Sequence, residues 1–98
     1  MGGEGLNSSE VLVSWSKYPD TLPSKSGYYF TYYYSKDQDQ HLYKAIYYDH
    51  HKNKWCSWRQ GMSDPIVKGF VEQSGKDYYT ECLRYAGEQV IEPFDDVW

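Results

Sequence analysis

The segment YYFTYYYS, residues 28–35, constrains the fold of this chain more than any other stretch. It holds five tyrosines, one phenylalanine and one threonine, and these residue types favour the extended conformation of a β-strand. Successive side chains of a strand point to opposite faces of the sheet, so this strand carries aromatic rings on both faces. A sheet with one wet face would alternate apolar and polar side chains. We therefore expect that both faces are covered, or that one face is an exposed aromatic surface.

The composition favours one ordered domain built largely from aromatic side chains. The chain has 98 residues, which is the size of a single domain, and tyrosine alone supplies 12 of them. Aromatic residues make up 19% of the sequence, which is unlike a disordered chain. Large aromatic side chains can build a core where aliphatic residues are few.

Further segments with strand-like composition alternate with polar turns. The expected strands are residues 11–15, 28–35, 41–48, 54–58 and 66–73. The turns between the three central strands, residues 36–40 and 49–53, are short and polar, which indicates an antiparallel arrangement. The fold class expected is mainly β, a small antiparallel meander of four to five strands.

The segment from Asp77 to Ala86 fits two kinds of secondary structure. Its alternation of side chains favours a strand. A short helix is the open alternative, capped by Asp77, ending at Gly87 and directing Tyr78, Cys82 and Tyr85 inward, and it would make the fold α+β. We expect a flexible N-terminal arm over residues 1–10, a single domain over residues 11–91 and an acidic-aromatic tail over residues 92–98.

The binding surface expected on the sheet lies on the face of Tyr29 and Tyr33. Phe30 has no polar group, so its face is assigned to the core and the opposite face to solvent. Neighbouring strands complete this surface, whose members are Tyr29, Tyr33, Lys44, Tyr48 and Trp58. Exposed aromatic patches often mark contact surfaces. A purely structural role, in which cross-strand tyrosine pairs stabilise the sheet, is an equal alternative.

The tail is a second candidate for binding. Its acidic and aromatic side chains are Phe94, Asp95, Asp96 and Trp98. Such a tail can dock into a basic, apolar groove of a partner. Alternatively, Trp98 folds back onto the domain and buries its large side chain there, and this reading is favoured.

The sequence lacks the local patterns expected of catalysis, metal binding or a bound cofactor. The triplet Asp49-His50-His51 echoes a phosphoesterase signature, but it falls in an expected turn and lacks further ligands. Cys56 and Cys82 do not form a zinc-binding pattern with the histidines and are interpreted as reduced, partly buried thiols. We expect no enzyme activity, metal or cofactor.

Charge and hydropathy bear on partners and location. The net charge is -4 without clustered Lys or Arg, which argues against nucleic-acid binding through a broad basic face. We find neither a signal peptide nor an apolar stretch that could span a bilayer, and expect a cytoplasmic location without membrane contact.

A pattern of aromatic, proline and glycine residues extends over residues 15–72. The pattern W-x-x-x-P-x-x-L-P-x-x-x-G-x-Y is carried by Trp15, Pro19, Leu22-Pro23, Gly27 and Tyr29, and it is followed by Ala45-x-Tyr47, Trp55 and the segment VKGFVE. In these features the chain resembles a family of short phage and prophage proteins of unknown function. The chain departs from the pattern at Phe70, where the family has Trp, and in lacking a Pro-rich finish. The resemblance implies a compact β-rich domain from a mobile genetic element, and it supplies no catalytic residues.

These observations lead to a non-enzymatic binding module as the expected function, acting on an unknown protein partner through an aromatic sheet face. One alternative is single-stranded nucleic acid stacked on Tyr29, Tyr33 and Tyr48, which requires that basic side chains converge beside these rings. The basic candidates are Lys44, Lys52, Lys54 and Arg59. Another is a small-ligand or carbohydrate site, or a small enzyme, in an aromatic cleft holding His41 or a carboxylate. A homodimer that covers the second face is a further possibility.

Overall fold

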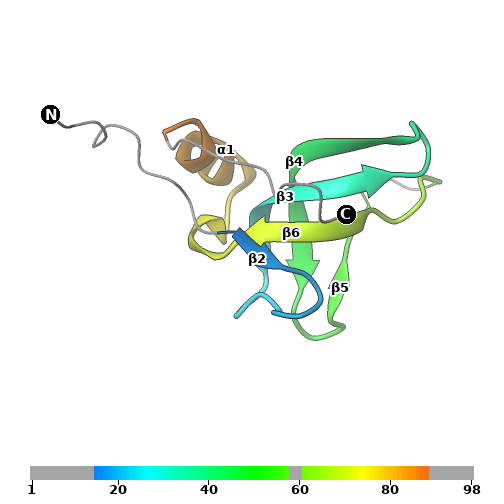
Figure 1. Ribbon diagram of the computed structural model, residues 1–98. Coiled ribbons are helices and arrows are strands. Elements are labelled where there is room, and N and C mark those ends of the chain that lie inside the picture. Colours follow the sequence, from blue (N-terminus) through cyan, green and yellow to red (C-terminus); the bar gives the residue numbers. More distant parts are fainter. Residues whose placement is uncertain (1–14, 58–60, 89–98) are drawn as a thin grey trace, which may run out of the picture.

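The computed structural model describes residues 15–57 and 61–88 of the chain. The strands are β2 (Trp15–Lys17), β3 (Gly27–Ser35), β4 (Gln40–Asp49), β5 (Lys54–Trp55) and β6 (Ile66–Val71). A short 3₁₀ helix η1 (Glu72–Ser74) and an α-helix α1 (Tyr79–Gly87) follow them (Figure 1). The expected arm (residues 1–10), the expected first strand except for Trp15 (residues 11–14) and the expected tail (residues 92–98) lie outside the described residues.

The five strands form one antiparallel sheet in the order β2-β6-β3-β4-β5. Strands β3, β4 and β5 are the expected meander, and the mainly β fold class is confirmed. Strand β6 returns to the other side of β3, so the chain crosses from one side of the meander to the other between β5 and β6. Strand β5 is shorter than the expected strand over residues 54–58, and β6 gives way to η1 before residue 73.

One face of the sheet, here called the inner face, carries the hydrophobic core. The core cluster consists of Tyr29, Tyr33, Ile46, Tyr48, Trp55, Val67 and Phe70. Their rings meet mainly edge to face, as between Tyr29 and Phe70 with centroids 5.6 Å apart, and between Tyr48 and Trp55 at 4.8 Å. This geometry is the favoured one for aromatic pairs and adds to the gain from burial.

An irregularity in β6 places two of its apolar side chains on the inner face. Val67 pairs with Tyr33 and Phe70 pairs with Thr31, and the register shifts between these pairs. Residues three apart on a regular strand would point to opposite faces. The extra residue of a β-bulge reverses this relation, so Val67 and Phe70 both enter the core.

The sheet bends around the inner face until its two edges approach each other. Tyr18 follows β2 at one edge, yet its ring lies 5.6 Å from that of Trp55 in β5 at the other edge. Lys54 Nζ also lies 3.7 Å from Asp64 Oδ2, which joins β5 to the segment before β6. The ribbon of the sheet is bent in this way in Figure 1. The core cluster lies on the concave side of this bend.

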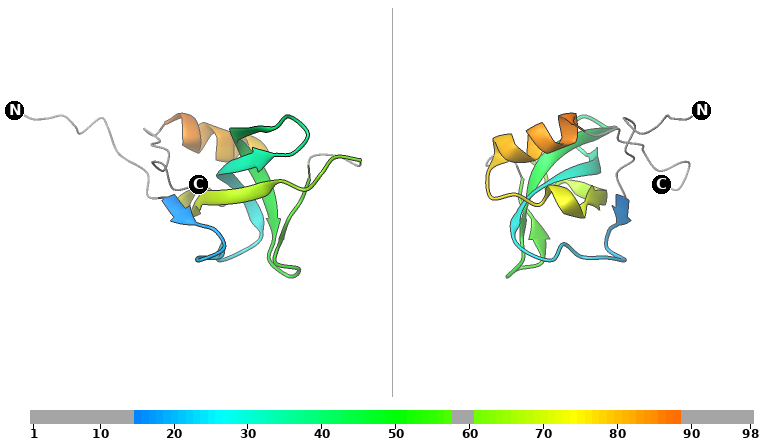
Figure 2. Two further views of the ribbon diagram at one scale, coloured as in Figure 1. Left: turned by 45° about the vertical axis from the view of Figure 1, so that its right-hand side comes forward. Right: turned by 90° about the vertical axis from the view of Figure 1, so that its left-hand side faces the viewer.

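Helix α1 lies over the opposite, outer face of the sheet (Figure 2). The outer face is defined by four cross-strand pairs of β3 and β4, which are Tyr28–Tyr47, Phe30–Ala45, Tyr32–Tyr43 and Tyr34–His41. The helix contacts β3 and β4, and its residue Tyr79 packs against Tyr28 with ring centroids 5.6 Å apart. The helix therefore covers only the end of the outer face near Tyr28.

The preference for a strand over residues 77–86 is wrong, and the alternative helix is observed. Strand pairing there would need a neighbour, whereas a helix satisfies its own backbone while burying Cys82 beneath it. The expected end at Gly87 is confirmed. The expected cap is not, because Tyr78 occupies the N-cap position without a side-chain hydrogen bond. Tyr78 is also exposed, not inward-facing.

Gly27 fixes the entry of the chain into β3. Its φ is +158°, and a Cβ at this position would lie 2.9 Å from the carbonyl oxygen of Lys76. The backbone of Tyr28 exchanges two hydrogen bonds with Lys76 at this point. Glycine is required because no side chain fits between the paired backbones.

In the part of the chain that the structure describes, no helix has the length and apolar character needed to cross a bilayer.

Candidate functional site

The structure places Tyr29, Tyr33 and Tyr48 in the core, so the prediction that they form an exposed surface is wrong. Their exposed fractions are 0%, 4% and 0%. A tyrosine can be buried without penalty where its hydroxyl finds a partner. Tyr29 donates to the carbonyl oxygen of Lys25 at 2.8 Å, and Tyr48 donates to Asn53 Oδ1 at 3.1 Å. The polar hydroxyl group of tyrosine therefore does not indicate which face of the sheet is exposed to solvent.

The other predicted site residues do not gather into one surface with these tyrosines. Lys44 is exposed, but it pairs with Thr31 and so belongs to the inner side of the sheet. The remaining predicted residues, Trp58, Phe94, Asp95, Asp96 and Trp98, lie outside the described residues.

An aromatic surface does exist, on the outer face that was assigned to the core. We call it the aromatic row, and it consists of Trp15, Phe30, Tyr32, His41 and Tyr43. Phe30 and Tyr43 stack with centroids 6.1 Å apart and planes 10° apart, and Tyr32 stacks on His41 at 5.4 Å. Tyr43 joins these two pairs, because its ring lies 4.9 Å from that of Tyr32.

The row is partly accessible to solvent. Tyr43 is 41% exposed, His41 is exposed, and Phe30 and Tyr32 are half-buried. Partial burial raises the pKa of the Tyr43 hydroxyl, and the neighbouring Tyr32 adds to the effect. The hydroxyl therefore stays protonated at neutral pH and can both donate and accept a hydrogen bond.

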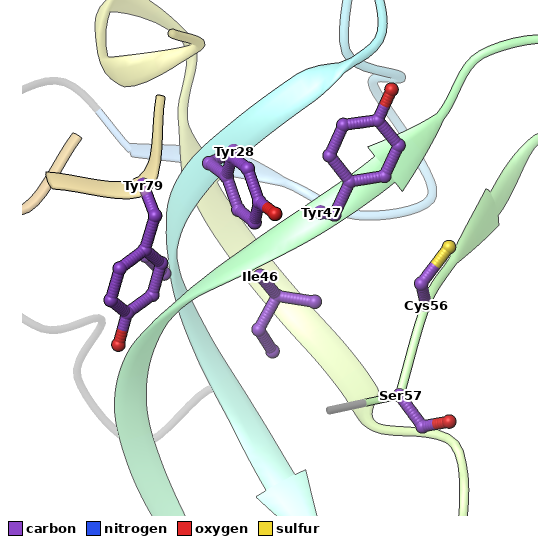
Figure 3. A pocket seen from close by; sticks show the side chains of 7 residues that line it. Tyr28, Ile46, Tyr47, Cys56, Ser57 and Tyr79 are labelled. Atoms are coloured by element: carbon purple, nitrogen blue, oxygen red, sulfur yellow. The ribbon is translucent and has the colours of Figure 1, made fainter. Parts of the chain in front are cut away.

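A cavity of about 360 Å³ lies at the end of the outer face, where α1 meets the sheet. Its described lining consists of Tyr28, Ala45, Ile46, Tyr47, Cys56, Ser57 and Tyr79. Figure 3 shows Tyr28 and Tyr79 on one side, Cys56 and Ser57 on the other, and Tyr47 between them. This described lining offers rings, hydroxyls and a thiol, and it contains neither a carboxylate nor a histidine.

A second cavity, of about 450 Å³, lies where the two edges of the sheet approach each other. Tyr18 and Trp55 form its aromatic wall, while Lys54 and Asp64 pair at its rim. Trp55 Nε1 is buried and has no hydrogen-bond partner among the described residues. Because this nitrogen is out of reach of solvent, it cannot bind a ligand in the cavity as the structure stands.

The two thiols differ in environment. Cys82 belongs to α1 and is fully buried, and this burial raises its pKa to about 11. Cys56 is half-buried and lines the cavity near α1. Both are free thiols.

The triplet Asp49-His50-His51 lies at the turn that follows β4, as the sequence predicts. Asp49 ends β4, and its Oδ1 accepts hydrogen bonds from the backbone N–H of His51 and Lys52. Among residues 15–57 and 61–88, no group of three or more His, Cys, Asp or Glu side chains could hold a metal ion.

Comparisons with protein-family models, with curated proteins and with solved structures found no match for this chain.

Proposed function

We propose that this chain is a non-enzymatic binding module that contacts a protein partner through the aromatic row. The observation that carries this proposal is the position of Tyr43. Its ring is 41% exposed and stacked on Phe30, although the core of the domain is already formed on the opposite face of the sheet. A domain short of apolar residues keeps a ring at the surface at some cost in free energy, which is offset when a partner covers it.

The row suits a protein partner because its rings are held in place before binding. Phe30, Tyr32, His41 and Tyr43 all lie on two strands paired along their length. Tyrosine has few rotatable bonds, so it loses little conformational entropy when a partner covers it. Its hydroxyl also satisfies polar groups at the rim of an interface.

The four basic residues named as candidates do not support binding of single-stranded nucleic acid at the row. Lys44 belongs to the opposite side of the sheet, and Lys54 pairs with Asp64. Lys52 lies in the turn after the far end of β4, and Arg59 lies outside the described residues. Stacking of bases needs cations beside the rings to neutralise phosphates, and these three lysines do not gather beside the row.

The test compares Tyr43→Ala with Tyr78→Ala in affinity capture from a lysate of the source organism, read by quantitative mass spectrometry. Tyr78 is a matched control because it is 71% exposed and lies outside the row. We expect one protein to be captured by the wild type and by Tyr78→Ala, and to be lost with Tyr43→Ala. The captured protein is then purified, and a loss of affinity of at least about tenfold with Tyr43→Ala is expected.

Two results would overturn the proposal. The first is capture that Tyr43→Ala leaves unchanged. The second is binding of an oligothymidine strand, or of a glycan on an array, that requires Tyr43 while no protein does. The origin in a phage or mobile element, and a cytoplasmic location, belong to this proposal as predictions.

A further inference from the structure

Over its first half, strand β4 has one edge that no other strand covers in the described part of the chain. On one side it pairs with β3 from Gln40 to Asp49. On the other side it pairs with β5 only at Tyr48 and Asp49, and Tyr47 accepts a hydrogen bond from the N–H of Cys56. Among residues 15–57 and 61–88, no strand pairs with this second side of β4 before Tyr47.

The direction of the Tyr47 carbonyl identifies the backbone groups along this edge. In an antiparallel sheet, successive residues direct their N–H and C=O groups to alternate sides. The backbone C=O of Tyr47 points toward β5. The backbone groups of Ala45, Tyr43 and His41 therefore point to the same side, whereas those of Leu42 and Lys44 point toward β3. Tyr28, the partner of Tyr47, directs its own groups away from β4 to Lys76, which agrees with this pattern.

Exposure limits the usable edge to two residues. His41 and Tyr43 are exposed, whereas Ala45 is fully buried. An incoming strand would therefore approach this edge at His41 and Tyr43 and not at Ala45. This part of β4 also lacks proline and bulges, two devices that protect sheet edges.

We propose that this edge pairs with the same edge of a second copy of the chain, antiparallel and about a two-fold axis at Leu42. This register is the one that uses both exposed residues and no others. His41 of each copy exchanges both backbone hydrogen bonds with Tyr43 of the other, which gives two such pairs across the axis. A register centred on Tyr43 would require the buried Ala45, and one centred on His41 would require the turn residue Asp39.

The side chains in this register are compatible on both sides of the joined sheet. Leu42 meets Leu42 of the second copy as a pair that is not hydrogen-bonded, in which side chains lie closest. Tyr43 stands opposite His41 of the second copy, as Tyr34 stands opposite His41 within one chain, where the two ring centroids lie 5.2 Å apart. Lys44 stands opposite Gln40, so no like charges face each other across the pair.

The dimer joins the two aromatic rows into one surface across the axis. Tyr43 and His41 sit at the end of each row that meets the axis. The proposed partner would then contact a surface with two-fold symmetry. This inference goes beyond the proposed function and does not depend on it, because self-association is measured without the partner.

Cysteine cross-linking tests the register. The test protein carries Cys56→Ser together with Leu42→Cys. The Cα atoms of a pair that is not hydrogen-bonded are about 4.5 Å apart, which lies within the range that a disulfide can join. We expect Leu42→Cys to form a covalent dimer under mild oxidation.

The matched control is Lys44→Cys in the same background. Residue 44 stands opposite residue 40 of the second copy, so the thiols introduced at position 44 of the two copies lie too far apart to join. Cross-linking of Lys44→Cys as fast as that of Leu42→Cys would overturn the proposed register.

Amide hydrogen exchange by NMR provides a second readout on the wild-type chain, without any substitution. The amides of His41 and Tyr43 should slow by at least about tenfold between low micromolar and near-millimolar protein. The amides of Leu42 and Lys44 already bond within the chain and should not change. Sedimentation velocity over the same range is expected to show a dimer. A monomer throughout, or a dimer in which His41 and Tyr43 exchange as before, would overturn the inference.

Discussion

Gly75 lies directly against the ring of Tyr29. A Cβ at Gly75 would stand 2.7 Å from the Tyr29 hydroxyl oxygen and closer still to two ring carbons. Tyr29 is fully buried between Trp55 and Phe70, so its ring has no room to retreat. The glycine is needed for space and not for its backbone conformation, because its φ of -62° suits any residue.

Gly75→Ala is therefore expected to lower the free energy of unfolding by about 1–3 kcal/mol, the usual cost of overpacking a core. Gly87→Ala is the control, because a Cβ there has no atom within 4 Å. In the helix, that change should be neutral or stabilising by up to about 1 kcal/mol. Urea denaturation followed by tryptophan fluorescence measures both. Equal stabilities of the two variants would contradict the contact.

The two faces of β3 and β4 should respond differently to loss of a ring. Tyr29→Ala removes a fully buried ring and should cost about 3–5 kcal/mol. Tyr43→Ala removes a ring that is 41% exposed and should cost no more than about 1 kcal/mol. Urea denaturation of both variants tests this assignment. A larger loss for Tyr43→Ala would mean that the inner and outer faces are reversed.

Stability should fall at alkaline pH because of the buried tyrosines. Burial raises the pKa of Tyr33 above its ordinary value of 10.0, and it also raises the pKa of Tyr29, with the charge of Glu72 as a further cause. The unfolded chain then loses these protons at lower pH than the folded one. Their contribution is fully present below about pH 10 and is lost as the pH rises above it.

Urea midpoints measured from about pH 8 to about pH 11 report this decline. The control is Tyr33→Phe, which keeps the ring but has no proton to release. Its decline, relative to its own stability at neutral pH, should be smaller than that of the wild type. Equal declines in the urea midpoint of the two proteins would show that the Tyr33 hydroxyl does not contribute to the loss of stability at high pH.

The two thiols should react at separate stages. At about pH 8 Cys82 is buried and protonated, since its pKa is raised to about 11, whereas Cys56 is half-buried and lines a cavity. Ellman's reagent should modify one thiol in the folded chain and the second only in urea. Cys56→Ser should remove the first reaction and Cys82→Ser should leave it. Two fast reactions in the folded wild type would contradict the burial of Cys82.

Sequence reasoning identified the central strands because their local composition and pattern agree. Residues 28–35 and 41–48 consist largely of strand-forming residues between polar turns, and β3 and β4 match them to within one residue at each end. The local pattern does not decide between a helix and a strand over Tyr79–Gly87. The side chains of this segment fit both the helical period and the two-residue alternation of a strand, and only its contacts with β3 and β4 favour the helix.

The sequence by itself determined that this chain forms a small antiparallel sheet with aromatic rings on both faces, because alternation along a strand is a local property. It could not determine which face is buried. Tyr29 and Phe30 differ by one hydroxyl, and the Lys25 carbonyl that satisfies the hydroxyl of Tyr29 is placed only by the fold. The curvature that brings Tyr18 to Trp55, and the bulge that turns Val67 inward, decided that the Tyr29 face became the core. The position of the candidate site follows from this, because the aromatic row consists of rings on the face opposite the core.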